Sequence, residues 1–165
     1  MERRGGLLAV LAVALISASA TAGAQTAPAA DPTPPPDVAA ISRVVDGFIE
    51  ALNAADIEKL AGFFAPDATA FFPLAPFVER LENKDQINKV FAAFFETVRR
   101  GKTGPPYLSL LPQDARIQLY GSAAVVTFHF RGTELFSRRT LVLKKERGTW
   151  LIVHLHASGI AGQKG

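Results

Sequence analysis

The run Trp150–Gly159, near the end of the chain, is the feature that most constrains the fold. Most of its side chains are apolar, so that both faces of an extended strand would carry apolar groups. A strand that is apolar on both faces is normally covered on both sides. The run therefore predicts a sheet with helices on one face and a partner subunit or another layer on the other.

Two histidines, His154 and His156, lie within this run. Because residues i and i+2 of a strand point the same way, the spacing predicts that both imidazoles share one face of the strand. We expect this face to adjoin a sheltered cavity. The predicted rows are Trp150, Ile152, His154, His156 and Ser158 on one face, and Leu151, Val153, Leu155 and Ala157 on the other.

The N-terminal segment has the layout of a secretory signal peptide. Arg3 and Arg4 precede the apolar run Leu7–Ile16, and small residues follow up to Ala24. The apolar run has roughly ten residues, about half of what a membrane-spanning helix needs. We expect residues 1–24 to be a signal peptide cleaved near Ala24, which gives an exported, periplasmic or secreted product without a stable membrane anchor. An uncleaved anchor is the alternative.

The rest of the chain divides by composition. Residues 25–36 form a Pro/Ala-rich linker, residues 37–160 have the size of a single domain, and residues 161–165 are a short tail. The sequence contains no cysteine, so that stability must come from a packed core. A net charge of +3, without interleaved basic and aromatic residues, does not support a nucleic-acid partner.

The first half of the domain shows helical periodicity, with apolar residues three and four positions apart. Capping residues precede these stretches, and proline or glycine ends them. The predicted elements are a helix with Asp37 as its N-cap that continues to Leu52, a shorter helix that begins at Asp56, includes Phe64 and ends before Pro66, a strand over Ala68–Leu74, and a helix that follows Asn83 and ends at Gly101.

The second half is strand-like and is interrupted by glycine-containing turns typical of antiparallel hairpins. Three helices and such strands predict an α+β domain, in which the helices pack on a curved antiparallel sheet and form a cone with a pocket. Most of the 12 phenylalanines are expected in the core. The predicted strands are Tyr107–Leu111, Ala115–Tyr120, Ala123–Arg131, Leu135–Lys145 and Thr149–Ser158.

This order of elements resembles the nuclear transport factor 2-like superfamily, which has a cystatin-like cone. The segment Arg138–Leu143, followed after Gly148 by Trp150–Ser158, resembles the last hairpin of SnoaL-like domains and also that of the association domain of calcium/calmodulin-dependent kinase II. The segment Phe48–Asp56 is similar to the opening of these domains. The resemblance implies a pocket inside the cone and a homodimer through the outer face of the sheet, here Leu151, Val153 and Leu155.

The resemblance also implies a small-molecule ligand or substrate and no cofactor. We expect the cone to bind a small, largely apolar ligand. The alternative is a cofactor-free isomerase, cyclase or dehydratase, with His154 as catalytic general base and Arg138 or Tyr107 as hydrogen-bond donor. A second alternative is a non-catalytic oligomerisation module. The Asp, Tyr and second acid of ketosteroid isomerase cannot be placed residue by residue here.

Arg138 has two interpretations. Its planar guanidinium would suit a carboxylate in the cavity, or it would pair at the surface with Glu134 or Glu146. No metal site is expected, because His129 alternates with the apolar row of its strand and would point away from the cavity. The predicted ligand-binding residues are His154, His156, Arg138, Trp150, Phe48 and Tyr107.

Overall fold

The structure is a computed structural model that describes residues 35–73, 79–132 and 135–161. The predicted signal peptide, nearly all of the predicted linker and nearly all of the predicted tail lie outside these ranges. Within them, no helix combines the length and apolar character needed to cross a membrane.

Helix α1, Pro36–Asn53, confirms the first predicted helix and buries its apolar stripe. Its N-cap is Pro35, so the prediction that Asp37 is the N-cap is wrong. Asp37 lies in the first turn instead. Its Oδ1 atom accepts hydrogen bonds from Lys145 Nζ at 2.5 Å and from Trp150 Nε1 at 3.2 Å. The carboxylate therefore connects the start of α1 to the last hairpin rather than to its own helix.

Helices α2, Ile57–Ala61, and α3, Lys84–Arg99, begin at the predicted capping residues. Asp56 Oδ1 and Asn83 Oδ1 each accept the backbone N–H of the residue three positions later, at 3.0 Å. After α3 the chain turns at Gly101, where φ is +74°, a value that glycine adopts without strain. The two sequence signals that mark the ends of α3, the N-cap Asn83 and the glycine Gly101, are therefore confirmed.

Five strands form one sheet in the order β1-β5-β4-β3-β2. Strands β2 to β5 pair antiparallel as predicted, whereas β1 pairs parallel with β5. The three helices and this curved sheet confirm the predicted α+β class. The prediction that Phe64 is helical is wrong, because β1 begins there. The strands are β1 Phe64–Phe71, β2 Gln113–Tyr120, β3 Ala123–Arg131, β4 Leu135–Glu146 and β5 Thr149–Ala161.

A β-bulge at Val153 divides β5 into two parts of opposite phase. Leu143 of β4 pairs with Ile152, and its neighbour Val142 pairs with His154, so that Val153 has no partner on β4. An extra residue in one strand reverses which side chains face the core. The buried residues of β5 are Trp150 and Ile152 before the bulge, and Leu155 and Ala157 after it.

The segment Tyr107–Leu111 is not a strand, so that prediction is wrong. Its backbone pairs with Asn53 at the C-terminus of α1 instead of with the sheet. Asn53 Oδ1 accepts the N–H of Leu110 at 2.8 Å, and Asn53 Nδ2 donates to the Leu110 carbonyl at 3.1 Å. The main-chain carbonyl of Asn53 accepts the N–H groups of Tyr107 and Leu108 at 2.8 and 3.1 Å. A single helix end therefore holds this segment over the sheet.

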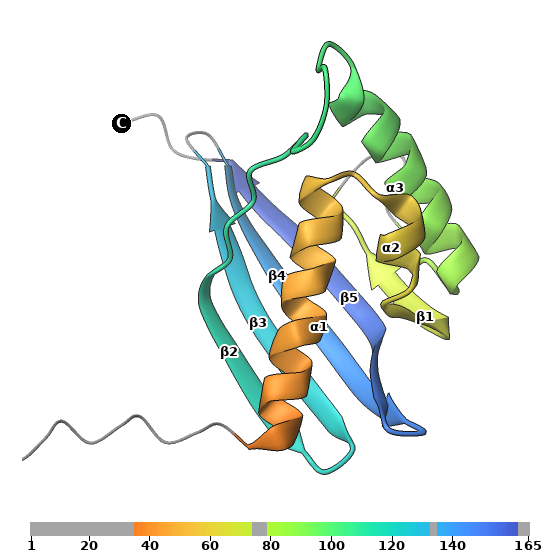
Figure 1. Cartoon of the computed structure of the whole chain (residues 1–165), viewed down its shortest axis with the longest axis vertical. Coiled ribbons are helices and arrows are strands. Elements are labelled where there is room, and N and C mark those ends of the chain that lie inside the picture. Colours follow the sequence, from red (N-terminus) through yellow and green to blue (C-terminus); the bar gives the residue numbers. More distant parts are fainter. Residues whose placement is uncertain (1–34, 74–78, 133–134, 162–165) are drawn as a thin grey trace, which may run out of the picture. The chain divides into compact units, whose positions relative to one another are not determined.

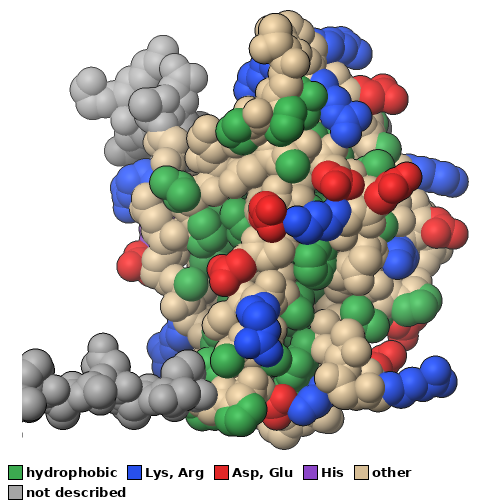
Figure 2. Space-filling view, in the orientation of Figure 1, with side chains coloured by type: hydrophobic (Ala, Val, Ile, Leu, Met, Phe, Trp, Pro, Cys, Tyr) green, Lys and Arg blue, Asp and Glu red, His purple; other side chains and the backbone are tan. Residues whose placement is uncertain are grey.

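Helix α1 lies across the sheet in front of β3 and β4, whereas α2 and α3 lie near β1 (Figure 1). The core fills the space between these helices and the sheet. Phe48 of α1, Leu60 of α2 and Ile87 of α3 are fully buried with Leu141 and Ile152 of the sheet. On the helix-bearing face, basic and acidic side chains are interspersed rather than gathered by sign (Figure 2).

Candidate ligand-binding cavity

A cavity of about 320 Å³ lies between the helices and the inner face of the sheet. Helices α1 and α3, the segment held by Asn53, and strands β3, β4 and β5 all contribute to its wall. Five of its lining residues are phenylalanines, and most of the others are aliphatic. The lining residues are Phe48, Leu52, Phe72, Pro73, Val90, Phe91, Phe94, Leu108, Leu110, Phe130, Gly132, Ser137, Arg139 and Leu155.

The aromatic side chains of the wall pack on one another and on the core. Phe72 and Phe91 meet edge to face, with ring centres 5.1 Å apart and an interplanar angle of 87°. Phe91 also contacts Phe64 and Phe95 in the core, at 6.3 and 5.9 Å between ring centres. Such edge-to-face and tilted contacts stabilise the ring positions beyond simple burial. The apolar wall of the cavity is therefore an extension of the core.

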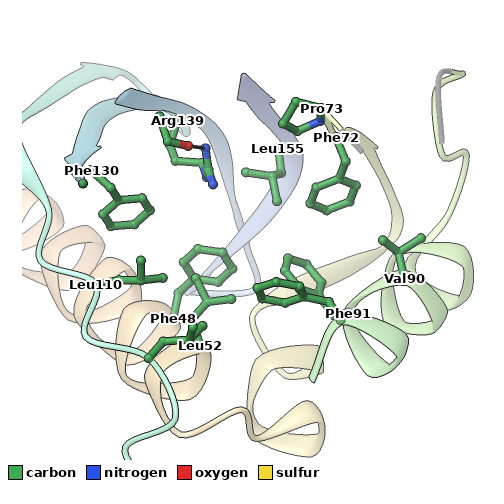
Figure 3. A pocket seen from close by; sticks show the side chains of 14 residues that line it. Phe48, Leu52, Phe72, Pro73, Val90, Phe91, Leu110, Phe130, Arg139 and Leu155 are labelled. Atoms are coloured by element: carbon green, nitrogen blue, oxygen red, sulfur yellow. Dashed lines mark hydrogen bonds between the residues drawn. The ribbon is translucent and has the colours of Figure 1, made fainter. Parts of the chain in front are cut away.

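Arg139 is the only charged residue in the described lining of the cavity. Its side chain extends from β4 into the space between Phe130 and Leu155 (Figure 3). Its Nη1 atom donates hydrogen bonds to Ser137 Oγ at 2.5 Å and to the Arg138 carbonyl at 2.8 Å. Burial lowers the pKa of Arg139 from its ordinary value to about 10, so the guanidinium keeps its charge at neutral pH.

Ser137 holds Arg139 from the same strand. It is 7% exposed and is the one buried polar or charged residue in the described part of the chain. Its hydroxyl accepts from Arg139 and donates to the Ser158 carbonyl of β5 at 3.4 Å. The guanidinium of Arg139 also stands over the ring of Phe130, at 5.3 Å from the ring centre. Neutral groups thus orient this partly buried cation.

The predicted row that placed both histidines with Trp150 and Ile152 is wrong. The bulge at Val153 separates the two halves of that row, so that Leu155 lines the cavity and its neighbours His154 and His156 face the opposite side of the sheet. Both imidazoles contact Phe71 of β1, with ring centres 5.9 and 5.8 Å away. Phe71 is 37% exposed, which places this group at the outer surface.

His154 lies in a half-buried polar pair on that outer face. Its Nδ1 atom is 2.8 Å from Oγ1 of Thr69, a hydrogen bond whose donor depends on the tautomer. Burial, followed by the charges of His156 and Arg80, lowers the pKa of His154 below its ordinary value of 6.5. The imidazole of His154 is therefore favoured in its neutral form but does not contact the cavity.

The other predicted site residues are distributed over the molecule. Phe48, one of the predicted ligand-binding residues, lies in the cavity wall. Arg138 is exposed and lies on the outer face of β4, so the cavity position belongs to Arg139. Trp150 is 3% exposed and lies in the core, where it binds Asp37. Tyr107 is half-buried beside Arg99, whose Cζ is 5.8 Å from its ring centre, and lies outside the lining.

The alternation predicted for β3 is confirmed. His129 points away from the core and packs against Phe136 in a tilted arrangement, at 4.7 Å between ring centres, with Asp114 Oδ2 3.4 Å from its Nε2. Within the described ranges, no three histidine, aspartate or glutamate side chains come close enough to hold a metal ion. In the same ranges the cavity wall carries no carboxylate and no imidazole.

The sequence contained a signal for Arg139 that our prediction missed. Leu141 and Leu143 are the buried leucines of β4, and a step of two residues back from Leu141 reaches Arg139 rather than Arg138. For the histidines the sequence holds no comparable signal, because both rows of β5 are apolar and the alternation looks unbroken across Val153.

Solved structures of the nuclear transport factor 2-like class share this fold. A putative dehydratase of that family from Streptomyces avermitilis matches with a TM-score of 0.63 at 17% identity, over 76% of this chain and 97% of the other. A ketosteroid isomerase-like protein from Erwinia carotovora atroseptica matches with a TM-score of 0.61 at 19% identity, over 77% and 98%. Identities this low establish a common fold only.

A comparison of the sequence with family profiles identifies the family. The profile of the SnoaL-like domain matches residues 41–162, nearly all of the described domain. The chain therefore belongs to the SnoaL-like domain family. Among curated proteins, none matches the chain significantly.

Proposed function

We propose that this SnoaL-like domain binds a small, largely apolar molecule in its cavity. The observation that carries the proposal is the apolar wall, which includes five phenylalanines around about 320 Å³. This volume is near the lower end of the roughly 300–1,000 Å³ typical of small-molecule pockets, which are mostly apolar with a few polar groups. Here Ser137 and Arg139 are those polar groups.

The cavity lies beside α1 and the segment that Asn53 holds, so its wall is built on elements tied to one another. A preformed apolar cavity reduces the cost of ordering protein side chains around a ligand. Binding to such a wall would be driven mainly by removing apolar surface from water.

The proposal is tested by titrating the protein with the neutral, apolar dye N-phenyl-1-naphthylamine and measuring the affinity by calorimetry. We expect the purified protein to bind the dye and Leu110→Trp, which fills the cavity, to weaken binding by about tenfold or more, about 1.4 kcal/mol. Leu111→Trp is the matched control, because Leu111 is the next residue, is 74% exposed and lies outside the lining. Equal affinity of both variants, or no binding by the wild type, would contradict the proposal.

An isomerase, cyclase or dehydratase with a histidine base is the weaker candidate. A general base must lie within hydrogen-bond reach of the proton that it removes, or reach it through one water. His154 and His156 lie across the sheet from the cavity, and the described wall offers neither a carboxylate nor an imidazole. No observation in the structure favours this alternative over binding.

We also propose that the protein forms a homodimer through the outer face of the sheet. In the described part of the chain the helices lie on the other face (Figure 1). Leu151 and Val153 of β5 are half-buried apolar residues, and Val142 of β4, which pairs with the adjacent His154, is half-buried as well. Leu155, which we predicted in this row, lines the cavity instead and is 1% exposed. The proposed interface therefore keeps Leu151 and Val153 and loses Leu155.

We also propose that the domain acts outside the cytoplasm after export. The supporting pattern is the one in residues 1–24, where Arg3 and Arg4 precede an apolar run and Ala24 ends a small-residue segment. Mass spectrometry of the protein from its own host tests this, because cleavage after Ala24 would leave Gln25 as the first residue. A mature chain that retains Leu7–Ile16 would contradict it.

A further inference from the structure

The cation Arg139 lies in the apolar wall of the cavity without a counter-charge in the described part of the chain. The ion pairs there join other residues, and the hydrogen-bond partners of Arg139 are a hydroxyl and a carbonyl. Arg139 is partly buried, and a charge that is partly withdrawn from water without an opposite charge is costly, a cost that an apolar side chain would not carry. A charged residue in this position therefore calls for a partner that these residues do not supply.

The geometry of the guanidinium leaves one edge for such a partner. Both protein hydrogen bonds of Arg139 use Nη1, one to Ser137 Oγ and one to the Arg138 carbonyl. The N–H groups on Nε and Nη2 have no acceptor among the described residues, and neither atom is sealed inside the protein without a partner. Adjacent N–H groups of a guanidinium form a planar fork that matches the two oxygens of a carboxylate.

From this arrangement we infer that the ligand is an amphipathic monocarboxylate, with its carboxylate on the Nε–Nη2 edge of Arg139 and its apolar body among the phenylalanines. The inference rests on the proposed function, that is, on a small molecule occupying this cavity. A single cation matches a single negative charge. A dianion such as a phosphomonoester would bring a second charge into a wall whose described residues offer no second cation.

The apolar body has a defined direction from that anchor. In Figure 3, Arg139 lies between Phe130 and Leu155, and Phe48 and Phe91 lie across the open space from its guanidinium. A ligand anchored at Arg139 would therefore extend from β4 toward α1 and α3. Its specificity would come from the charged end, because the apolar wall discriminates only by size and shape.

Calorimetric titration with matched probe pairs tests the inference. Octanoate and octan-1-ol form one pair, and 2-naphthoate and naphthalene-2-methanol form the other, so that each pair differs only in the charged group. We expect at least one carboxylate to bind about tenfold or more tightly than its alcohol, because hydrogen bonds to charged groups exceed neutral ones. The Arg139→Leu variant should remove this preference while it still binds the neutral dye.

Arg138→Leu is the matched control, because Arg138 is adjacent on the same strand, exposed and on the other face of the sheet. This variant should keep the preference for the carboxylate. That result would show that the loss of one positive charge is not enough to remove the preference. Arg139→Gln, which retains polarity, serves as the second variant in case Arg139→Leu fails to fold. Melting temperatures of all variants separate lost recognition from lost structure.

The outcomes distinguish the inference from the proposed function. Equal affinities within both probe pairs, or a carboxylate preference that survives Arg139→Leu and Arg139→Gln, would overturn the inference and leave dye binding intact. If neither the probes nor the dye bind, both the inference and the proposed function fail.

Discussion

The carboxylate of Asp37, in the first turn of α1, accepts a hydrogen bond from the indole Nε1 of Trp150 on β5 at 3.2 Å. Lys145 Nζ of β4 donates to the same oxygen at 2.5 Å and lies 5.9 Å from the centre of the Trp150 ring. Three side chains from α1, β4 and β5 thus join the start of the first helix to the hairpin that ends the sheet.

This contact predicts a pH-dependent contribution to stability. The hydrogen bonds from Lys145 and Trp150 lower the pKa of Asp37 below its ordinary value of 3.8. A depressed carboxylate pKa stabilises the fold above the unfolded value, and this stabilisation is lost as the pH falls through the folded value. We expect Asp37→Asn to lower the free energy of unfolding at neutral pH, with a difference from wild type that shrinks below pH 3.8. Urea denaturation at several pH values measures it, and a pH-independent difference would contradict the assignment.

The bulge at Val153 predicts unequal effects for adjacent residues of β5. Leu155 is 1% exposed in the cavity wall, so Leu155→Ala should lower the free energy of unfolding by about 2–5 kcal/mol. His156 is exposed, and His156→Ala should change it by less than about 0.5 kcal/mol. Chemical denaturation of both variants tests which side chains of β5 face the core. If the alternation were unbroken across Val153, His156→Ala would be the more destabilising change.

His154 should titrate below its ordinary pKa of 6.5, because burial and the charges of His156 and Arg80 disfavour its protonated form. Nuclear magnetic resonance of the imidazole measures the midpoint directly. We expect His156→Gln to raise the pKa of His154, because it removes a positive charge nearby. An unchanged midpoint in that variant would show that the two rings do not interact.

The same shift has a consequence for stability, with a sign opposite to that of a histidine paired with an acid. Since the folded state disfavours protonation, the contribution is fully present above pH 6.5 and declines as the pH falls from 6.5 toward the folded pKa of His154. His154→Gln should lack this decline. Unfolding curves between pH 5 and pH 7, within about one or two units of the ordinary histidine pKa, provide the comparison.

Val153→Glu should convert the proposed dimer into monomers, because it places a carboxylate in an apolar contact on the outer face of the sheet. Static light scattering of the purified protein measures the mass in solution. Arg147→Glu is the control, because Arg147 is exposed in the turn between β4 and β5 and should leave the mass unchanged. A dimer that persists in Val153→Glu would remove Val153 from the interface.

Much of the fold could be predicted from local signals. Asp56 and Asn83 cap their helices through their own side chains, and turns at Gly121 and Gly148 separate consecutive strands. These features depend on residues a few positions apart, which the sequence shows directly. The parallel pairing of β1 with β5 could not be predicted in this way, because it joins Phe64 to Ile152 across the whole domain.

The site shows the same division. Phe48, one of the predicted ligand-binding residues, faces the cavity, because an unbroken helical period determines its face. The assignment of Arg138 instead of Arg139 was an error of phase that Leu141 and Leu143 could have corrected. The placement of His154 in the cavity could not have been corrected from the sequence, since the extra residue at Val153 is visible only in the pairing of β4 with β5.

The sequence by itself determined the family, the number and order of the helices, and the antiparallel hairpins that follow them. These depend on capping, period and turn residues, which act over a few positions of the chain. The tertiary structure alone decided which face of β5 carries the histidines and which residues meet in the cavity. A single unpaired residue reverses every side chain beyond it, and only the register against the neighbouring strand reveals that residue.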